Sequence, residues 1–184
     1  MHYQNLQEYE LPEDFRGRSP YLVQLWWLVQ AILINPSPQF MYGWRRFLLR
    51  LFGAKIGSNV IIRPSVKVTY PWKLTVGNYS WIGDEVVLYT LGEIVIGENS
   101  VISQRSYLCT GSHNYTKRTF DIYAKKITIG NEVWISADVF IAPGVSIGDG
   151  AVIGARSTVL EDMPGGMVCY GSPARAIKPR VMSE

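Results

Sequence analysis

The sequence of 184 residues predicts a mainly β fold, a parallel β-helix of about five triangular coils with an N-terminal α-helical segment and one protruding loop. Three observations predict this fold. A branched aliphatic residue recurs at every sixth position, a small residue often stands four positions after it, and the rhythm is interrupted once, after residue 108. Helices repeat every 3.6 residues and ordinary strands every two, so hexads indicate a solenoid built of repeats.

The recurring aliphatic residues are expected to point into the solenoid. They fall into groups of three, and three hexads make one coil in which each hexad forms one flat side. Each contributes roughly 1.5 to 3 kcal/mol of transfer free energy, largely offset by the chain entropy lost on ordering. The predicted inward-facing residues are Ile56, Ile62, Val68, Val76, Ile82, Leu88, Ile96, Ile102, Leu108, Ile129, Ile135, Ile141, Ile147, Ile153 and Val159.

Glycine often follows the inward-facing residue, as at Gly57, Gly77 and Gly97. A corner of the coil can use a residue without a Cβ atom at this place. Like residues then stack on one another from coil to coil. A charge at an inward-facing position should therefore break the fold locally.

The length of the chain supports one core rather than two domains. We expect an N-terminal arm and two helices over residues 1–55, the β-helix over 56–164 with a loop at 114–126, and a capping tail over 165–184. The arm at residues 1–19 is polar and is expected to be extended.

Composition limits the classes of partner and compartment. A formal net charge of +3 with 18% charged residues lies near the globular average and indicates no nucleic-acid partner. Cys109 and Cys169 form neither a disulfide framework nor a metal motif, so we expect ordinary thiols, no metal and a reducing, cytoplasmic compartment.

Two helices joined by a proline turn are predicted over residues 21–34 and 39–52. The apolar run at 20–35 is shorter than the ~20 residues that span a bilayer. One interpretation is that the helices cover the open end of the solenoid. The alternative is peripheral contact with the inner face of a membrane. The residues that would make this contact are Trp26, Trp27, Leu28, Phe40, Trp44 and Arg45.

The interruption after residue 108 places a thirteen-residue segment, 114–126, directly after Ser112 and His113. A regular coil does not need these residues. Long loops that leave a rigid scaffold are preferred places for binding sites. We therefore expect the functional site near His113.

Residues 56–180 resemble the hexapeptide-repeat acetyltransferases of the galactoside, maltose and nodulation-factor type, and among them most closely the colanic acid biosynthesis acetyltransferases of exopolysaccharide synthesis. The resemblance implies a left-handed winding of the β-helix and a homotrimer with active sites between neighbouring chains. Four stretches carry it: Gly111–Tyr115, Ile127–Ile135, Ile141–Val159 and Gly171–Arg175 with Ile177 and Lys178.

His113 is the predicted catalytic residue, because the other imidazole, His2, lies in a terminus that is expected to be mobile. A neutral imidazole can take a proton from an alcohol at neutral pH. The family's catalytic histidine also falls on His113. A covalent intermediate on Ser112 is not expected, because neighbours on an extended strand point to opposite faces, and nothing in the sequence marks a depressed pKa at Cys109.

The resemblance implies acetyl-CoA as co-substrate, with a contribution from the capping tail. Backbone groups are expected to make most contacts to its pantetheine arm, and Ala137 N–H is the expected oxyanion donor. Basic side chains suit the phosphates of the nucleotide end. The residues that match cofactor positions are Trp134, Ala137, Ala155, Leu160, Arg175 and Lys178.

The acceptor side departs from the family pattern. An Asn and an Asp hold the sugar in the galactoside and maltose enzymes, whereas the matching positions here are Gly83 and Leu91. Simple β-galactosides and maltose are therefore not the expected substrates. Aromatic and hydroxyl-binding side chains suit another carbohydrate, and the candidates are Tyr89, Thr90, Glu93, Tyr115, Asp121 and Tyr123.

The expected function is O-acetylation of a sugar of an exopolysaccharide or of a lipid-linked oligosaccharide precursor. An antibiotic hydroxyl or an amino sugar is an alternative acceptor, and a non-catalytic β-helix trimer is an alternative class. A zinc enzyme of the same repeat fold would need three histidines, which the sequence does not supply.

Overall fold

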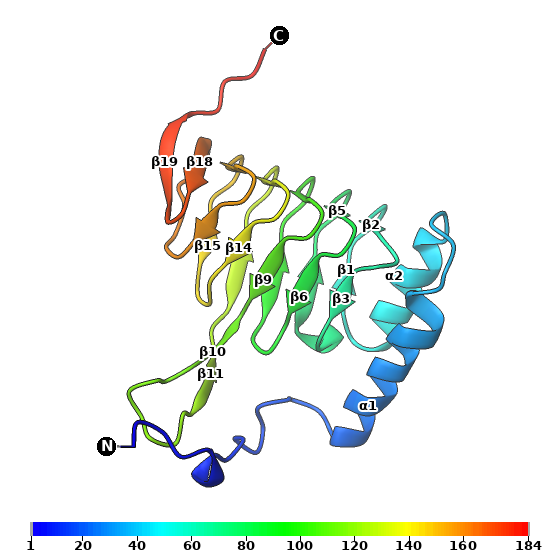
Figure 1. Ribbon diagram of the computed structural model, residues 1–184. Helices are drawn as coiled ribbons and strands as arrows, with labels where there is room; N and C mark the ends of the chain where they lie inside the picture. The colour runs from blue at the N-terminus through cyan, green and yellow to red at the C-terminus, as the bar shows by residue number, and fades with distance from the viewer. Residues whose placement is uncertain (1, 184) are drawn as a thin grey trace.

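The computed structural model describes residues 2–183 as a three-sided β-solenoid (Figure 1). Helices lie at one end, and the antiparallel strands β18 and β19 lie at the other. Three sheets form its sides. Sheet A contains β1 (Lys55–Ile56), β4 (Leu74–Val76), β7 (Ile94–Ile96), β12 (Ile127–Ile129) and β15 (Ser146–Ile147). Sheet C contains β3 (Lys67–Val68), β6 (Val87–Tyr89), β9 (Tyr107–Cys109), β14 (Phe140–Ile141) and β17 (Thr158–Val159).

Sheet B is the longest side of the solenoid. A bridge from Ile147 to Met163 and the pairing of β18 with β16 begin a sixth turn, so the solenoid has five complete coils and part of another. The strand β19 closes the sheet in antiparallel fashion. Sheet B contains β2 (Ile61–Ile62), β5 (Trp81–Ile82), β8 (Val101–Ile102), β13 (Trp134–Ile135), β16 (Val152–Ile153), β18 (Met167–Gly171) and β19 (Ala174–Pro179).

The interior confirms the hexad prediction. All the predicted inward-facing residues are buried, and none of them is more than 7% exposed. Parallel pairing aligns Ile82 with Ile102 and Ile102 with Ile135, so like side chains form ladders along the solenoid. Cys169 continues this ladder beyond Ile153 and is also fully buried.

The glycines that follow the inward-facing residues serve close approach between coils. A Cβ atom on Gly77 would lie 2.6 Å from the carbonyl carbon of Gly97 in the next coil. Gly77 itself does not have a positive φ. The left-handed conformation at the corners is instead adopted by side-chain-bearing residues such as Tyr79 (φ 58°) and Asn99 (φ 53°). The absence of a Cβ atom is therefore needed for coil spacing, and not for an unusual turn.

Two helical segments cover the first coil. The helix α1 (Pro20–Val29) continues into a wider π-helical turn, η2 (Gln30–Ile34), and α2 (Tyr42–Leu51) follows the proline turn. Ser19 caps α1, and Pro20 occupies its first position, where its missing N–H costs nothing. We call α1, η2 and α2 together the helical cap.

The inner face of the helical cap satisfies backbone groups at the open end of the solenoid. Trp26 Nε1 donates to the carbonyl of Val68 (2.8 Å), and the amide oxygen of Gln30 accepts from the N–H of Val68. Three arginines of α2 also donate to carbonyl groups of the first coil. These bonds run from Arg45 Nε to Ile62 (2.6 Å), from Arg46 Nη1 to Val60 (2.8 Å) and from Arg50 Nε to Ile56 (2.9 Å). None of the helices in residues 2–183 is long and apolar enough to cross a membrane.

Candidate active site

A hairpin interrupts the solenoid between sheets C and A. Hydrogen bonds between neighbouring coils show where the chain is longer. Ser80 and Ser100, which are bonded across two coils, are 20 residues apart, whereas the next bonded pair, Ser100 and Val133, is 33 residues apart. The additional residues form an antiparallel pair of strands, β10 (Gly111–His113) and β11 (Ile122–Ala124). Figure 1 shows this hairpin projecting from the side of the solenoid. His113 lies at the outer end of β10, where the regular coils no longer support the chain.

The imidazole of His113 is held in one orientation by Phe120. His113 Nδ1 lies 2.8 Å from the carbonyl oxygen of Phe120, and the two rings stack with centroids 4.3 Å apart and planes 9° apart. A carbonyl oxygen only accepts hydrogen bonds, so Nδ1 carries the hydrogen. In the neutral ring, Nε2 then keeps its lone pair and is available as a base.

The backbone of Phe120 is left-handed, with φ of 52°. A bulky residue rarely adopts this conformation, because its Cβ atom crowds the backbone. Here it lets one residue present both its carbonyl and its ring to His113. No sequence signal marked Phe120, since only Gly or Asn would have suggested a positive φ.

The N-terminal arm lies beside the imidazole. The ring of Tyr9 lies 6.2 Å from that of His113, and the N–H of Asn5 donates to the carbonyl of Arg118 on the hairpin. A shallow cavity of about 240 Å³ is lined by Leu6, Tyr9, His113 and Phe120. The sequence predicted only an extended arm, because contacts with a distant hairpin leave no local pattern.

The alternative nucleophiles near His113 are poorly placed. Burial raises the pKa of the Cys109 thiol, so little thiolate forms at neutral pH, and its Sγ lies 3.1 Å from the carbonyl of Gly111. Ser112 pairs with Tyr123 across the hairpin, and its neighbour His113 pairs with Ile122. Alternation along the strand directs the two side chains to opposite faces.

Tyr89 lies near Tyr9, which lines this cavity, but Tyr89 does not line the cavity itself. Burial raises the pKa of Tyr89, and the neighbouring Cys109 and Tyr9 raise it further. Burial likewise raises the pKa of Tyr107, whose ring lies 5.9 Å from that of Tyr89, to about 12. Both phenols therefore stay neutral and can donate hydrogen bonds.

Thr90 and Glu93 occupy other surroundings. Thr90 is fully buried, and its hydroxyl both accepts from the N–H of Tyr70 and donates to the carbonyl of the same residue. A hydroxyl used in this way does not reach a bound sugar, so Thr90 belongs to the packing of the solenoid. Glu93 lies 3.6 Å from Lys126 and lines a hollow over sheet A.

The remaining acceptor candidates lie on the hairpin. Tyr115 is 83% exposed. A hydrogen bond from Lys117 lowers the pKa of Asp121, which lines a second hollow beside the N-terminal arm. Tyr123 faces Lys125, whose Nζ lies 5.7 Å from the ring centroid. The hairpin therefore carries polar and aromatic side chains, with Tyr123 on the face opposite His113 because it pairs with Ser112.

The cofactor candidates gather on sheet B and at the corner between sheets B and C. Trp134, on β13, is about half exposed, and its Nε1 donates to Ser103 Oγ (3.0 Å). The N–H groups of Ala137 and Ala155 have no acceptor within residues 2–183, and that of Gln104 in the preceding coil has none either. These three corners stack on one another. Such a column of N–H donors fits the carbonyl groups of a pantetheine arm.

The C-terminal tail extends the same sheet. Arg175 lies on β19 with its Nη1 3.4 Å from Glu161, and Lys178 lies on the same strand with an exposed side chain. Leu160 follows β17 and is 53% exposed. Cationic side chains at this edge fit the phosphates of a nucleotide.

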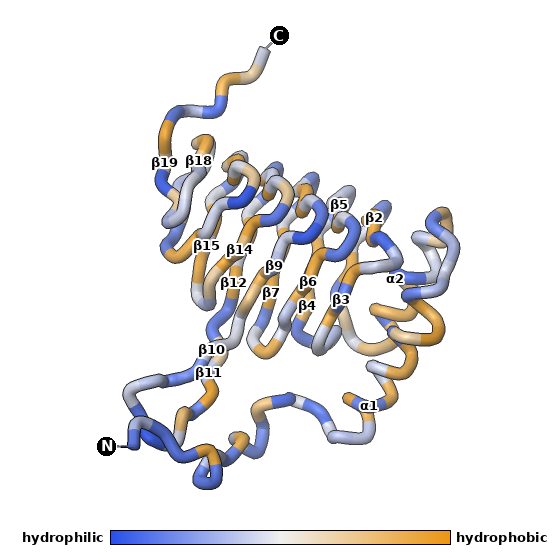
Figure 2. The backbone as a smooth tube through the Cα atoms, in the orientation of Figure 1, coloured by the Kyte–Doolittle hydropathy of each residue, from blue (hydrophilic) through white to orange (hydrophobic). Residues whose placement is uncertain are grey.

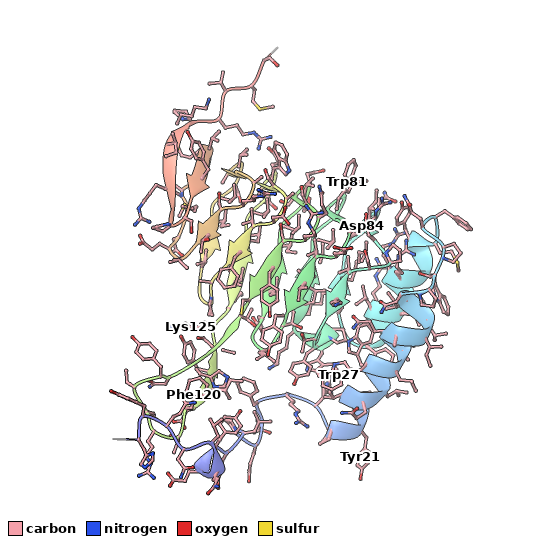
Figure 3. The ribbon with its side chains drawn as sticks, viewed as in Figure 1. Tyr21, Trp27, Trp81, Asp84, Phe120 and Lys125 are labelled. Atoms are coloured by element: carbon pink, nitrogen blue, oxygen red, sulfur yellow. The ribbon has the colours of Figure 1, made fainter. Side chains whose placement is uncertain are left out.

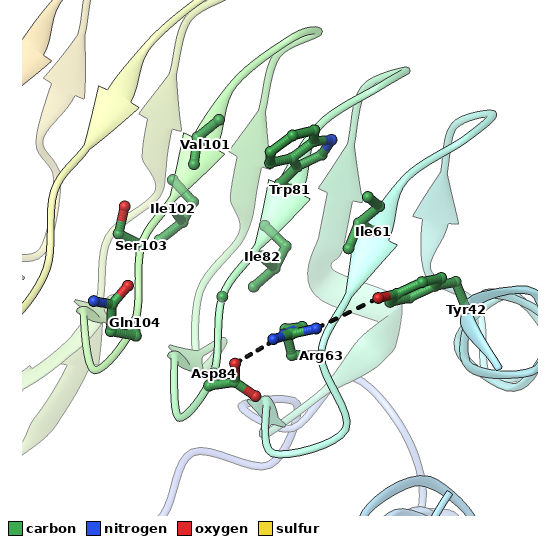
Figure 4. A pocket seen from close by; sticks show the side chains of 11 residues that line it. Tyr42, Ile61, Arg63, Trp81, Ile82, Asp84, Val101, Ile102, Ser103 and Gln104 are labelled. Atoms are coloured by element: carbon green, nitrogen blue, oxygen red, sulfur yellow. Dashed lines mark hydrogen bonds and ion pairs between the residues drawn. The ribbon is translucent and has the colours of Figure 1, made fainter. Parts of the chain in front are cut away.

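A separate pocket of about 350 Å³ lies on sheet B near the helical cap (Figure 4). Trp81, Gly83 and Tyr42 line it, together with an ion pair of 2.8 Å between Arg63 and Asp84. The hydrogen bond from Arg63 lowers the pKa of Asp84. Gly83, one of the two positions that the resemblance matched to sugar-binding side chains of the family, brings no side chain to this pocket.

One chain does not bring the catalytic and cofactor candidates together. His113 leaves the solenoid beyond sheet C, whereas Trp134 lies in the middle of sheet B. Figure 3 shows the same separation, with Phe120 on the hairpin and Trp81 and Asp84 on the opposite side of the solenoid. No hydrogen bond or ring contact within residues 2–183 joins His113 to Trp134.

Comparisons with known proteins show which family this chain resembles. Residues 126–161 match the family model described as bacterial transferase hexapeptide (six repeats). The chain is 60% identical to a candidate colanic acid biosynthesis acetyltransferase, WcaF, of Escherichia coli strain K12, over 98% of this chain and 100% of the relative.

Solved structures show the same fold over almost the whole chain. A galactoside acetyltransferase in complex with coenzyme A is 28% identical, with a TM-score of 0.83 over 94% of this chain and 85% of the other. A hexapeptide-repeat acetyltransferase of Vibrio cholerae in complex with acetyl coenzyme A is 25% identical, with a TM-score of 0.81 over 96% of both chains.

Proposed function

The chain belongs to the hexapeptide-repeat acetyltransferases, and we propose that it transfers the acetyl group of acetyl-CoA to a hydroxyl of a sugar in exopolysaccharide biosynthesis. The observation that carries this proposal is the orientation of His113, whose Nδ1 is engaged by the carbonyl of Phe120 so that Nε2 is left as a base. The high identity to a relative named for colanic acid synthesis supports the choice of acceptor.

The reaction is a direct transfer. Nε2 of His113 takes the proton of the sugar hydroxyl as its oxygen attacks the thioester carbonyl. The tetrahedral intermediate places negative charge on the former carbonyl oxygen, which the N–H of Ala137 stabilises. Collapse of the intermediate breaks the carbon–sulfur bond and forms the ester, and the imidazolium returns its proton to the CoA thiolate. General-base help of this kind contributes ~10² to 10⁴ in rate.

Acetyl-CoA fits the residues of sheet B. The column of N–H groups at Ala137 and Ala155 would hold the pantetheine arm, and Trp134 would border the thioester. Arg175 and Lys178 would neutralise phosphate charge, and Leu160 would supply apolar contact in place of a hydroxyl. The co-substrate supplies an activated acetyl group, and the chain positions it.

A homotrimer would complete the site. The hairpin of one chain would carry His113 to the cofactor groups of its neighbour, which accounts for their separation within one chain. Three-fold rings of this kind close without leaving an open surface. The two free thiols, Cys109 and Cys169, support a cytoplasmic location, where disulfides are rare.

The acceptor would lie between the hairpin and the N-terminal arm. Leu6, Tyr9 and Phe120 offer apolar and aromatic surface beside His113, and Tyr89 adds a neutral phenol. Aromatic faces with nearby hydroxyl groups suit sugar rings. The candidates Tyr115, Asp121 and Tyr123 lie on the same hairpin as His113. Tyr123 is on the opposite face because it pairs with Ser112, Asp121 lines the neighbouring hollow, and Glu93 lies farther along sheet A.

The test is release of free CoA thiol by the purified protein with acetyl-CoA and a panel of sugars, lipid-linked oligosaccharides, amino sugars and antibiotics. We expect turnover with a sugar acceptor and a ~10² to 10⁴-fold lower kcat for His113→Ala. The variant should keep the circular dichroism spectrum and the CoA affinity of the wild type. Undiminished activity of His113→Ala would disprove the general-base role, and turnover only with antibiotics would disprove the acceptor class.

A further inference from the structure

The helical cap is apolar on both of its faces, although only the inner face is covered. Val23, Trp26 and Ile34 point into the molecule and are at most 3% exposed. The opposite side carries a second apolar stripe at helical spacing. Its members are Tyr21 (88% exposed), Leu25 (49%), Leu28 (55%) and Ile32 (57%). A surface helix normally has one apolar stripe and a polar outer side.

The second helix continues this apolar surface. Phe47 and Leu51, one turn apart on α2, are 54% and 65% exposed. Leu51 and Leu25 line one hollow, which connects the two helices. We call the surface formed by Tyr21, Leu25, Leu28, Ile32, Phe47 and Leu51 the outer cap face. In Figure 2 hydrophobic colours run along α1 and α2 at this edge of the molecule.

The stretch of chain that carries the outer cap face is rich in positive charge and contains no acidic residue. No Asp or Glu occurs between Asp14 and Asp84. The same stretch contains nine cationic residues: Arg16, Arg18, Arg45, Arg46, Arg50, Lys55, Arg63, Lys67 and Lys73. The chain as a whole carries a formal charge of only +3, so this end is unusually basic.

Within residues 2–183 the arginines of α2 form no ion pair with an acidic side chain. Arg45, Arg46 and Arg50 donate to backbone carbonyl groups, which are neutral. Neutral side chains could donate the same number of hydrogen bonds to those carbonyl groups. Arginine side chains also place positive charge beneath the apolar surface. Arg18 stands at the rim of the hollow between Leu25 and Leu51.

We propose that the outer cap face docks on a lipid bilayer that contains anionic lipids. Exposed aromatic and aliphatic side chains enter the boundary between headgroups and acyl chains, and cations beside them meet anionic headgroups. A second copy of the chain is a poorer occupant, because it would bring two basic stretches together. Docking by this face does not depend on which hydroxyl is acetylated.

The experiment is flotation of the full-length protein with vesicles at about 0.15 M salt. One vesicle is phosphatidylcholine alone, and the other contains phosphatidylglycerol as well. We expect flotation with the anionic vesicles, much less with the neutral ones, and weaker binding as salt is raised. The double variant Leu25→Glu with Leu28→Glu should lower the bound fraction at least about tenfold, because it removes apolar contact and adds repulsive charge.

Val181→Glu is the matched control. Val181 is 87% exposed in the C-terminal tail, at the other end of the solenoid, so the same change in chemistry should leave flotation unaltered. Leu28→Gln with Ile32→Gln is a milder pair in case the charged pair is unstable, and it should weaken binding several-fold.

Three outcomes would overturn the proposal. The first is no flotation with either vesicle, and the second is equal flotation of the wild type and both cap variants. The third is an assembly larger in the wild type than in Leu25→Glu with Leu28→Glu by light scattering, because that would identify the face as a contact between copies of the chain. None of these readouts requires acetyl transfer.

Discussion

The regular coils and the β10–β11 hairpin are held by different kinds of contact. A residue such as Ile102 is paired on both sides, with Ile82 and Ile135, and is fully buried. The hairpin rests on three residue pairs and on the N-terminal arm. Stacking makes the coils over-determined, whereas the hairpin depends on a few specific contacts. Damage to the coils should therefore appear as lost stability, and damage to the hairpin as lost activity.

A charge in the interior gives the largest contrast. Ile102→Asp would bury an unpaired carboxylate between two apolar neighbours, at a cost of several kcal/mol, and we expect local loss of structure and a large fall in the midpoint of thermal unfolding. Tyr115→Asp on the hairpin, where the side chain is 83% exposed, should leave the free energy of unfolding within about 0.5 kcal/mol. An unchanged midpoint for Ile102→Asp would contradict the importance of the apolar ladder for stability.

Coil spacing can be tested at a single methyl group. Gly77→Ala would place Cβ 2.6 Å from a backbone carbon of the next coil and should destabilise the protein by about 1 to 3 kcal/mol in urea unfolding. Gly43→Ala is the matched control, because its Cβ would meet nothing closer than 3.9 Å at the start of α2. It should be neutral or stabilising by up to about 1 kcal/mol. Equal effects of the two substitutions would refute the spacing role.

The hairpin prediction concerns Phe120. Phe120→Gly keeps the carbonyl that engages His113 Nδ1 and tolerates the left-handed backbone, but removes the stacked ring. We expect kcat to fall by roughly 10 to 100-fold through misorientation of the imidazole. The midpoint of thermal unfolding should change little, because the coils are untouched. A large fall in the midpoint with unchanged kcat would reverse the assignment of the two regions.

The smallest effect concerns the ion pair on sheet B. The hydrogen bond from Arg63 lowers the pKa of Asp84 below its usual 3.8. The folded state therefore binds this proton more weakly than the unfolded chain, so the stabilisation is present above pH 4 and is lost as pH falls below it. Because the ion pair is partly exposed, it contributes about 0.2 to 1 kcal/mol to the free energy of unfolding.

Removing the carboxylate isolates this contribution. Asp84→Asn should lower the free energy of unfolding slightly at pH 7 and should match the wild type near pH 2. The difference between the two proteins in urea unfolding from pH 7 to pH 2 measures it. If the two proteins instead differ more in their free energy of unfolding at pH 2 than at pH 7, the predicted stabilisation by the Asp84 carboxylate is wrong.

The repeat explains why so much of the solenoid was predictable. Each inward-facing residue belongs to a period of six that can be read along the chain, and the register from Ile62 to Ile82 follows from the same period. The position of His113 followed from the interruption of that period and from its motif. The prediction of about five coils is confirmed, and β18 and Met163 add part of a sixth turn that no hexad marks in the sequence.

The surroundings of the imidazole were not predictable in the same way. The contact between Asn5 and Arg118 joins residues far apart in sequence, and no period relates them. Phe120 has a backbone conformation that its residue type disfavours, so only the surrounding hairpin could select it. Thr90, which is polar in sequence, proved to be an interior hydroxyl.

The sequence by itself determined the three-sided coil, the buried ladders and the place where one histidine leaves them, because hexad spacing dictates which side chains turn inward. Only the tertiary structure decided which nitrogen of His113 is free, what covers the ring and which face of the helical cap stays exposed. These features depend on contacts between segments that carry no common period, so they exist only once the chain has folded.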